Sequence, residues 1–225
     1  MTRKVFVFEL LIVAAALATT AVLYPQLPAQ VPFHWNLHNQ PDWYGPKWAL
    51  YWGGPGFMAA MMVFTWLFPW LSPKRFEIDS FWRTYHLATL LLFGMMTYIY
   101  AVLLWADSGR AIDMGRALLS GVCLFIALFG NVMGKLRRNF YLGVKTPWTL
   151  ASERVWNRTH RFAAKMWVGA GLLGLALSIG GLYLWAALAL LAAGLAPVVY
   201  SLVYYKQLER RGELGDDLAG GDGKQ

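Results

Sequence analysis

The feature that most constrains this chain is a run of 40 residues, 166–205, that contains no charged side chain. A single α-helix of that length would extend for about 60 Å. The hydrocarbon core of a bilayer is only about 30 Å thick. The run must therefore turn back on itself, and Gly180-Gly181 is the predicted corner. This stretch alone predicts two consecutive membrane spans.

The rest of the chain repeats the pattern in blocks of about 20 apolar residues, the length that a helix needs to cross a membrane. Charged residues make up 14% of the sequence, against about 25% in a soluble domain. The sequence thus predicts an all-α integral membrane protein with six transmembrane helices. The four spans before the central loop are expected at residues 5–24, 48–71, 86–106 and 114–133.

The basic residues predict the orientation. Assigning the loops alternately to the two sides places 17 of the 20 Lys and Arg on one side, and leaves Lys47, Arg110 and Arg116 on the other. The positive-inside rule then puts both the N and C termini in the cytoplasm. The net charge of +8 is explained by this orientation and by anionic lipid, so direct binding of nucleic acid is not expected.

Three regions follow from this pattern. Residues 1–72 hold the first two spans with a Pro-rich and aromatic loop, 25–47, outside the cell. Residues 73–211 hold four spans and a basic cytoplasmic loop, 134–165. Residues 212–225 are rich in Gly and Asp and are expected to be a disordered tail. Glu9 lies near the start of the first span and is expected to reach the headgroups.

Five prolines in the outer loop predict an ordered loop or a short strand-like segment. His34, Asn36 and Asp42 are the candidate ligand-binding side chains, although a purely structural cap over the first two spans explains the loop equally well. His34 and His38, with Asp42, also invite a metal interpretation. Their spacing would help only on a helix, which Pro32 argues against, so neither a metal nor another cofactor is predicted.

In the central loop, Thr146 and Thr149 are typical helix-start residues and Pro147 suits a first turn. Beyond them, a stripe of basic residues recurs at helical spacing and predicts an amphipathic helix that runs into the fifth span. Its partners are either lipid phosphates of the inner leaflet or a cytoplasmic protein. The stripe comprises Arg154, Arg158, Arg161 and Lys165.

The residues of this loop resemble the signature of the SdpI family of bacterial membrane proteins. Lys145 stands where the family usually has Arg, and this change removes a planar fork of donors. The matching residues are Asn131, Asn139, Gly143, Thr146, Pro147, Trp148, Thr149, Leu150, Glu153, Trp156, Thr159 and His160.

The outer loop is similar to a domain of unknown function that often precedes the SdpI region. Asn39 stands where that domain usually has Gly, and Asn also tolerates a left-handed backbone. The resemblance adds Lys47 to the ligand-binding candidates. The matching residues are Leu27, Pro28, Pro32, His34, Asn36, Asp42, Gly45 and Lys47.

The SdpI resemblance implies a multi-pass protein of the bacterial cytoplasmic membrane that gives immunity to a secreted, membrane-active toxin peptide. It also implies signalling in which a cytoplasmic repressor is held at the membrane, and it implies no enzymatic activity. The alternative is a membrane enzyme or small-solute permease with a polar or metal site at the outer loop. No Asp, Glu, Lys or Arg lies in the middle third of any expected span, which argues against a proton-driven pump.

Overall fold

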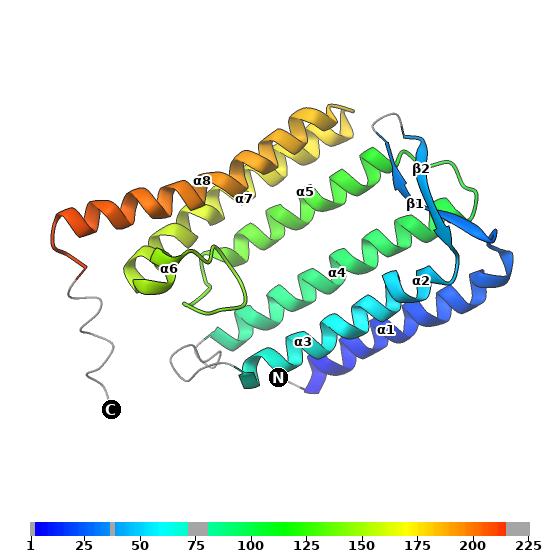
Figure 1. Cartoon of the computed structure of the whole chain (residues 1–225), viewed down its shortest axis with the longest axis horizontal. Coiled ribbons are helices and arrows are strands. Elements are labelled where there is room, and N and C mark those ends of the chain that lie inside the picture. Colours follow the sequence, from blue (N-terminus) through cyan, green and yellow to red (C-terminus); the bar gives the residue numbers. More distant parts are fainter. Residues whose placement is uncertain (1–2, 37–38, 72–80, 215–225) are drawn as a thin grey trace.

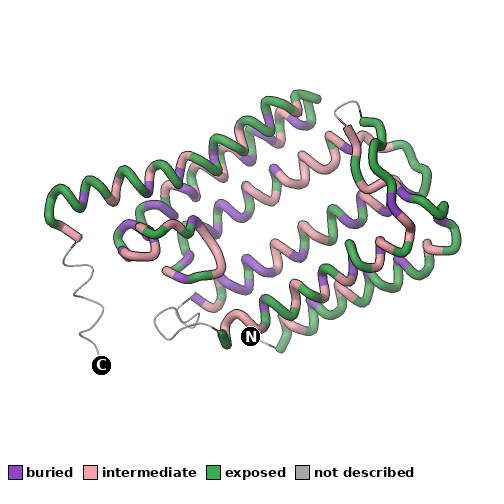
Figure 2. Tube along the Cα trace, viewed as in Figure 1, coloured by how far each residue is buried: buried purple, intermediate pink, exposed green. Residues whose placement is uncertain are grey.

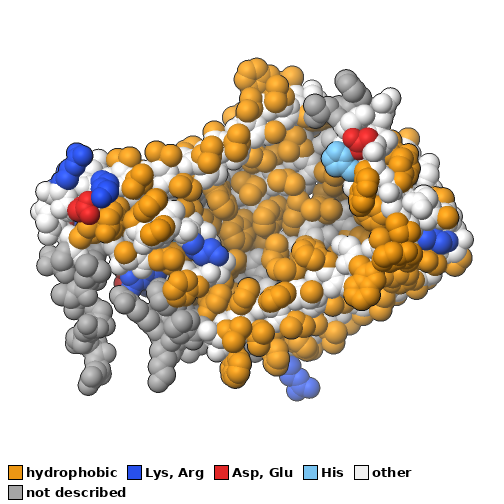
Figure 3. Space-filling view, in the orientation of Figure 1, with side chains coloured by type: hydrophobic (Ala, Val, Ile, Leu, Met, Phe, Trp, Pro, Cys, Tyr) orange, Lys and Arg blue, Asp and Glu red, His pale blue; other side chains and the backbone are white. Residues whose placement is uncertain are grey.

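The structure is a computed structural model, and it describes residues 3–36, 39–71 and 81–214. Six helices within these residues are long and apolar enough to cross a membrane. Most of their surface is exposed or half-buried (Figure 2), and the exposed side chains are largely apolar (Figure 3). This is the surface of a multi-pass, all-α membrane protein, as the sequence predicts.

The elements follow one another in an order that agrees closely with the predicted spans. The corner at Gly180-Gly181 is confirmed, since Gly181 takes a positive φ of 79° between the last two helices. The elements are α1 (Arg3–Leu23), η1 (Tyr24–Gln26), β1 (Gln30–Trp35), β2 (Pro41–Pro46), α2 (Ala49–Tyr51), η2 (Trp52–Gly56), α3 (Phe57–Leu71), α4 (Trp82–Asp107), α5 (Met114–Met133), α6 (Pro147–Ala151), α7 (Glu153–Ile179) and α8 (Tyr183–Arg210).

The helices form two groups that meet along α4 and α5 (Figure 1). One group contains α1, α3 and α4, and the other contains α5, α7 and α8. The start of α1, the end of α8 and the short helix α6 lie at one end of the molecule, whereas the two strands lie at the other. The arrangement agrees with a topology in which the outer loop and the central loop face opposite sides of the membrane.

Two apolar clusters hold the ends of the bundle. The first lies beneath the central loop and includes Tyr85, Met133 and Trp156. The second lies beneath the strands, where Val31 and Leu50 are fully buried. Each cluster therefore joins a loop to the helices below it.

The outer loop forms an antiparallel hairpin, which confirms the strand-like segment expected there. Val31 pairs with Gly45, and irregular register around His34 bends the ribbon. Asn39 takes the left-handed conformation with φ 61°. Its side chain donates to the Ile112 carbonyl at 3.0 Å and accepts from the Met114 backbone N–H at 2.7 Å. The turn of the hairpin is thus fastened to the start of α5.

The Gly-Gly-Pro-Gly segment of the second span is a π-helical turn, η2, with Pro55 inside it. Gly54 lies against the ring of Tyr100 so closely that a Cβ would fall 2.2 Å from a ring carbon. The Tyr100 hydroxyl lies 2.5 Å from Thr20 Oγ1, with which it shares a hydrogen bond. The small Gly54 of this turn therefore allows the second span to pack closely against α4.

Two expectations need correction. Glu9 does not reach the headgroups, because its side chain is fully buried where α1 packs on α4. The third helix begins at Trp82, four residues earlier than expected, which shortens the loop before it; residues 72–80 of that loop lie outside the described ranges. The expected disordered tail lies mostly outside them as well, since the description ends at residue 214.

Candidate functional site

The candidate site is a cavity of about 530 Å³ between the hairpin and the outer ends of α5 and α8, here called the outer cavity. Figure 3 shows the molecule hollowed beside the hairpin, with apolar side chains around the hollow. Its lining residues are Phe33, His34, Trp35, Asn36, Asn39, Asp113, Met114, Gly115, Leu118, Leu119, Val122, Tyr183, Leu184 and Ala187.

The hairpin places a histidine and an acid together at the rim of this cavity. The Nδ1 atom of His34 lies 2.5 Å from Oδ1 of Asp42, and both side chains are exposed. Asn36 also lines the cavity, and its side-chain oxygen accepts from the Gln40 backbone N–H at 3.0 Å. Three of the four predicted outer-loop residues are therefore brought together.

Lys47, the fourth predicted residue, lies elsewhere. Its ammonium group donates to the carbonyls of Tyr24 and Leu27 at 3.0 and 3.1 Å. It also lies over the Tyr24 ring, 4.5 Å from the centroid. Lys47 thus ties the end of the hairpin to the end of α1, which is a structural role.

Asp113 is a cavity residue that the sequence did not reveal. The hydroxyl of Tyr183 donates to its Oδ2 atom at 2.5 Å, and its other oxygen caps α5 by accepting from the Arg116 backbone N–H at 2.9 Å. Chiefly the Tyr183 hydrogen bond, with help from the helix cap, lowers the pKa of this carboxyl. Asp113 therefore supplies a fixed negative charge beside apolar walls.

These residues do not form a metal centre of the usual kind. No cluster of three or more His, Cys, Asp or Glu suited to a metal occurs in ranges 3–36, 39–71 and 81–214. His38, the second candidate ligand, lies outside those ranges. What the outer cavity offers is an apolar volume with one carboxylate and one His-Asp pair at its edge, a surface suited to an amphipathic ligand.

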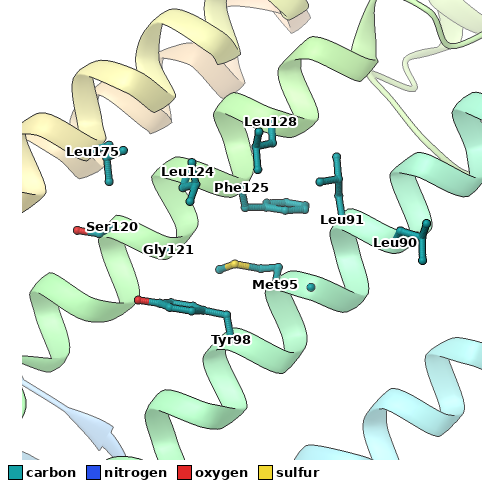
Figure 4. A pocket seen from close by; sticks show the side chains of 11 residues that line it. Leu90, Leu91, Met95, Tyr98, Ser120, Gly121, Leu124, Phe125, Leu128 and Leu175 are labelled. Atoms are coloured by element: carbon teal, nitrogen blue, oxygen red, sulfur yellow. The ribbon is translucent and has the colours of Figure 1, made fainter. Parts of the chain in front are cut away.

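A second cavity, of about 310 Å³, lies in the membrane-spanning part between α4 and α5 (Figure 4). Its walls are apolar side chains such as Leu91, Met95 and Phe125. The Tyr98 hydroxyl donates to the Ala117 carbonyl, and Ser120 shares a hydrogen bond with Ser178. Because these hydroxyls bond within the protein, this cavity suits only an apolar group, and the outer cavity is the better candidate for specific binding.

The cytoplasmic motif forms a compact cluster of buried, hydrogen-bonded side chains, here called the knot, rather than an open site. Asn139 is fully buried and accepts from the backbone N–H groups of Tyr141 and Leu142, both at 2.8 Å. The Val144 N–H donates to Nε2 of His160 at 3.1 Å, and Nδ1 of His160 lies 2.9 Å from the Trp156 carbonyl. This pattern places the ring proton of His160 on Nδ1.

Aromatic stacking completes the knot. The rings of Trp156 and His160 stack with centroids 3.9 Å apart, and Trp156 Nε1 donates to the Leu136 carbonyl at 2.8 Å. Gly143 has φ 115°, and a Cβ there would fall 2.2 Å from Nε2 of His160. No residue other than glycine fits this position without a shift of the histidine.

The short helix α6 has the predicted start. Thr146 and Thr149 form a reciprocal capping box, with Pro147 in the first turn. The Thr149 hydroxyl also donates to the Val144 carbonyl at 2.8 Å. The chain then breaks at Ser152, which caps α7, so the amphipathic helix and the fifth span are one helix, as predicted, with a separate turn before it.

Other motif residues contact neighbouring elements. Trp148 Nε1 donates to the Ser201 hydroxyl of α8. The Lys145 ammonium donates to the carbonyls of Phe140 and Tyr141 at 3.1 and 3.2 Å, so Lys makes two contacts here without the fork of an Arg. Arg138, which the motif did not include, donates to the last carbonyls of α6, those of Leu150 and Ala151.

Four motif residues are exposed, Lys145 and Pro147 among them, and one is buried with an unsatisfied group. Asn131 is exposed. Glu153 is also exposed, with only a 3.8 Å ion pair to Arg137. Thr159 is fully buried, and its hydroxyl has no hydrogen-bond partner among the described residues. The knot therefore explains most of the motif as architecture and leaves little of it available for ligand contact.

Comparison with known proteins supports both resemblances. Residues 135–204 match the model of the SdpI/YfhL protein family, and residues 11–59 match that of a domain of unknown function (DUF1648). The chain is 28% identical over 209 residues to Immunity protein SdpI of Bacillus subtilis (strain 168), covering 90% of this chain and 96% of the relative. No solved structure matches significantly. The chain is thus a multi-pass bacterial membrane protein similar to SdpI.

Proposed function

We propose that this protein gives its cell immunity to a membrane-active peptide. Its relative in Bacillus subtilis carries the name Immunity protein SdpI. The observation that carries the proposal is similarity over nearly the whole of both chains, since it includes the hairpin region as well as the cytoplasmic motif. Similarity confined to the motif would indicate only a shared fold of the last helices.

The outer cavity is the proposed site of contact with the peptide. A peptide that inserts into membranes presents apolar side chains, and the walls formed by Leu118, Leu119 and Val122 can cover them. Asp113 and the His34–Asp42 pair supply partners for an amine or a backbone N–H. The prolines of the hairpin lower the entropy lost on binding, because they restrict the free loop.

The signalling part of the proposal concerns the opposite end of the molecule. The central loop keeps Lys135, Arg137 and Lys145 exposed around the buried knot. A cytoplasmic repressor with an acidic surface would meet these side chains. The knot joins this loop to α7 and α8, and α8 also lines the outer cavity. A contiguous path of packed elements therefore links the two ends.

The rival function is that of a membrane enzyme or permease with a site at the hairpin. The His34–Asp42 pair could orient a proton-transfer group. Among the described residues that line the outer cavity there is no Ser, Cys or Thr to act as a nucleophile. The described ranges also hold no cluster of three or more His, Cys, Asp or Glu suited to a metal. Immunity is therefore the function that we favour.

The test is expression in a bacterium that is sensitive to a panel of secreted membrane-active peptides, with survival as the readout. We expect the protein to protect against at least one peptide, and the variant His34→Ala/Asp42→Ala to lose protection at normal abundance in the membrane. Lys47→Ala is a poor probe because it loosens the hairpin. Equal survival with and without the protein against every peptide contradicts the proposal.

A further inference from the structure

Arg158, Arg161 and Lys165 of α7 form a stripe of exposed cations, here called the basic stripe. Arg154, one turn earlier, is paired with Glu213 at 2.7 Å. In the parts of the chain that the structure describes, the three cations of the stripe have no acidic partner within 4.0 Å. Three unpaired positive charges on one face indicate a ligand of negative charge.

The same face of α7 continues into the membrane. Gly169, Leu172 and Ala176 follow Lys165 at helical spacing and are all exposed. Leu172 lies seven residues beyond Lys165, which corresponds to about 10 Å along the helix axis. Since the apolar part of the face meets acyl chains, the basic part of the same face meets the headgroups above them.

A stack of aromatic side chains lies at the level of the stripe. The rings of Phe162 and Tyr200 stack with centroids 4.6 Å apart, and Tyr204 continues the stack at 5.9 Å from Tyr200. Tyr is enriched where the bilayer meets water. Phe162 follows Arg158 by one turn and precedes Lys165, so the stack joins α7 to α8 at the level of the stripe.

We propose that the basic stripe binds the phosphate of an anionic phospholipid such as phosphatidylglycerol. A guanidinium group forms paired hydrogen bonds with phosphate oxygens, and each basic residue near an anionic membrane surface strengthens binding about fivefold. A lipid is preferred to a soluble acidic protein because the stripe continues directly into a lipid-facing surface. The site is independent of the proposed immunity and of peptide binding outside.

The experiment uses the full-length protein in mixed micelles that contain equal amounts of phosphatidylglycerol and phosphatidylcholine. Native mass spectrometry measures the ratio of the two lipids retained on the protein. We expect the variant Arg158→Gln/Arg161→Gln to lower the preference for phosphatidylglycerol roughly tenfold or more. The variant Arg158→Lys/Arg161→Lys keeps the charges and should keep most of the preference.

The matched control is Lys135→Gln/Arg137→Gln, which removes the same charge from exposed positions at the same end of the molecule. We expect this control to keep the wild-type preference. An unchanged preference in the stripe variant overturns the proposal, as does an equal loss in both variants, which would reflect net charge alone. Displacement of the lipid by inorganic phosphate at constant ionic strength would also overturn it, in favour of a site for the free ion.

Discussion

At the scale of single residues, the cytoplasmic motif works by satisfying backbone groups of an irregular loop. Asn139 accepts from two backbone N–H groups, and His160 accepts from a third. Buried backbone groups without partners are costly, so a loop packed under a membrane helix needs such side chains. The motif is therefore as much a requirement of folding as a mark of function.

We predict that Trp156→Ala lowers the free energy of unfolding by about 3–5 kcal/mol, because it removes a fully buried indole and its bond to Leu136. Glu153→Ala is the control on the same helix and should change stability by less than about 1 kcal/mol, since its ion pair is long and exposed. Thermal unfolding in detergent measures both. Similar melting temperatures for the two variants would contradict the knot as described.

Gly143→Ala should lower the melting temperature more than Gly109→Ala does. Both glycines have positive φ, 115° and 77°, so both substitutions strain the backbone. A Cβ at Gly143 also meets His160, whereas one at Gly109 meets nothing within 4 Å. Equal effects of the two substitutions would show that the contact with His160 carries no weight.

Acid should weaken the outer end of the protein through Asp113. The pKa of this carboxyl is lowered in the folded protein, so its contribution to stability is present above the unfolded pKa of about 3.9 and is lost as the pH falls through the lower folded value. We expect Asp113→Asn to reduce the dependence of the melting temperature on pH below about pH 4. An identical pH profile for the variant and the wild type would contradict this assignment.

The sequence predicted some of these residue roles and missed others. The cap at Thr146 and the left-handed Asn39 were predictable, because caps and turns depend on local backbone conformation. The pairing of Tyr183 with Asp113 was not, since the two are 70 positions apart in the sequence. The burial of Glu9 was missed for the same reason, because it depends on which helix α1 packs against.

At the scale of elements, the hairpin connects the first two membrane spans and lines the outer cavity together with α5 and α8. Its turn is fastened to the start of α5 by Asn39, and its base to the end of α1 by Lys47. The strand-like character was predictable from the prolines. The place of the hairpin against α5 and α8 was not, because no local pattern encodes that contact.

Asn39→Gly should loosen the hairpin without unfolding the helices. Glycine accepts the positive φ of this position but loses both bonds to the α4–α5 turn. We expect faster hydrogen exchange over β1 and β2, with little change in the melting temperature. Gln40→Ala is the matched control, because only the backbone of Gln40 is bonded here. Unchanged exchange in Asn39→Gly would show that the fastening is unimportant.

The structure also shows which helix the small residues of α7 pack against. Gly171 and Gly174 of α7 approach Cys123 and Ala127 of α5, where an added Cβ would fall within 2.8 Å of α5 atoms. The glycines thus allow α7 to pack closely against α5. The sequence shows that small residues allow close packing, but it does not say which helix fills the space.

At the scale of the whole molecule, the positions of the spans were predictable from the length of the apolar blocks. The distribution of basic residues predicts which side of the membrane each loop faces. The division into two helical groups, with a cavity at the outer end, was not. It depends on how α4 and α5 meet, and most of their facing side chains are apolar.

The topology makes a prediction that single cysteines can test. Cys123 is fully buried, so new cysteines at Gln40 and Lys145, both exposed, should dominate labelling in intact cells. We expect a membrane-impermeant maleimide to label Gln40→Cys but not Lys145→Cys until the cells are opened. Labelling of both positions from outside would contradict the orientation.

The central claim is that the outer cavity is where the protein meets the peptide. Leu118→Trp should fill this cavity, whereas Leu172→Trp adds the same bulk to an exposed, lipid-facing position of α7. The decisive measurement is survival of peptide-challenged cells that carry each variant at equal membrane abundance. We predict that Leu118→Trp loses protection and that Leu172→Trp keeps it. Full protection by Leu118→Trp would contradict the claim.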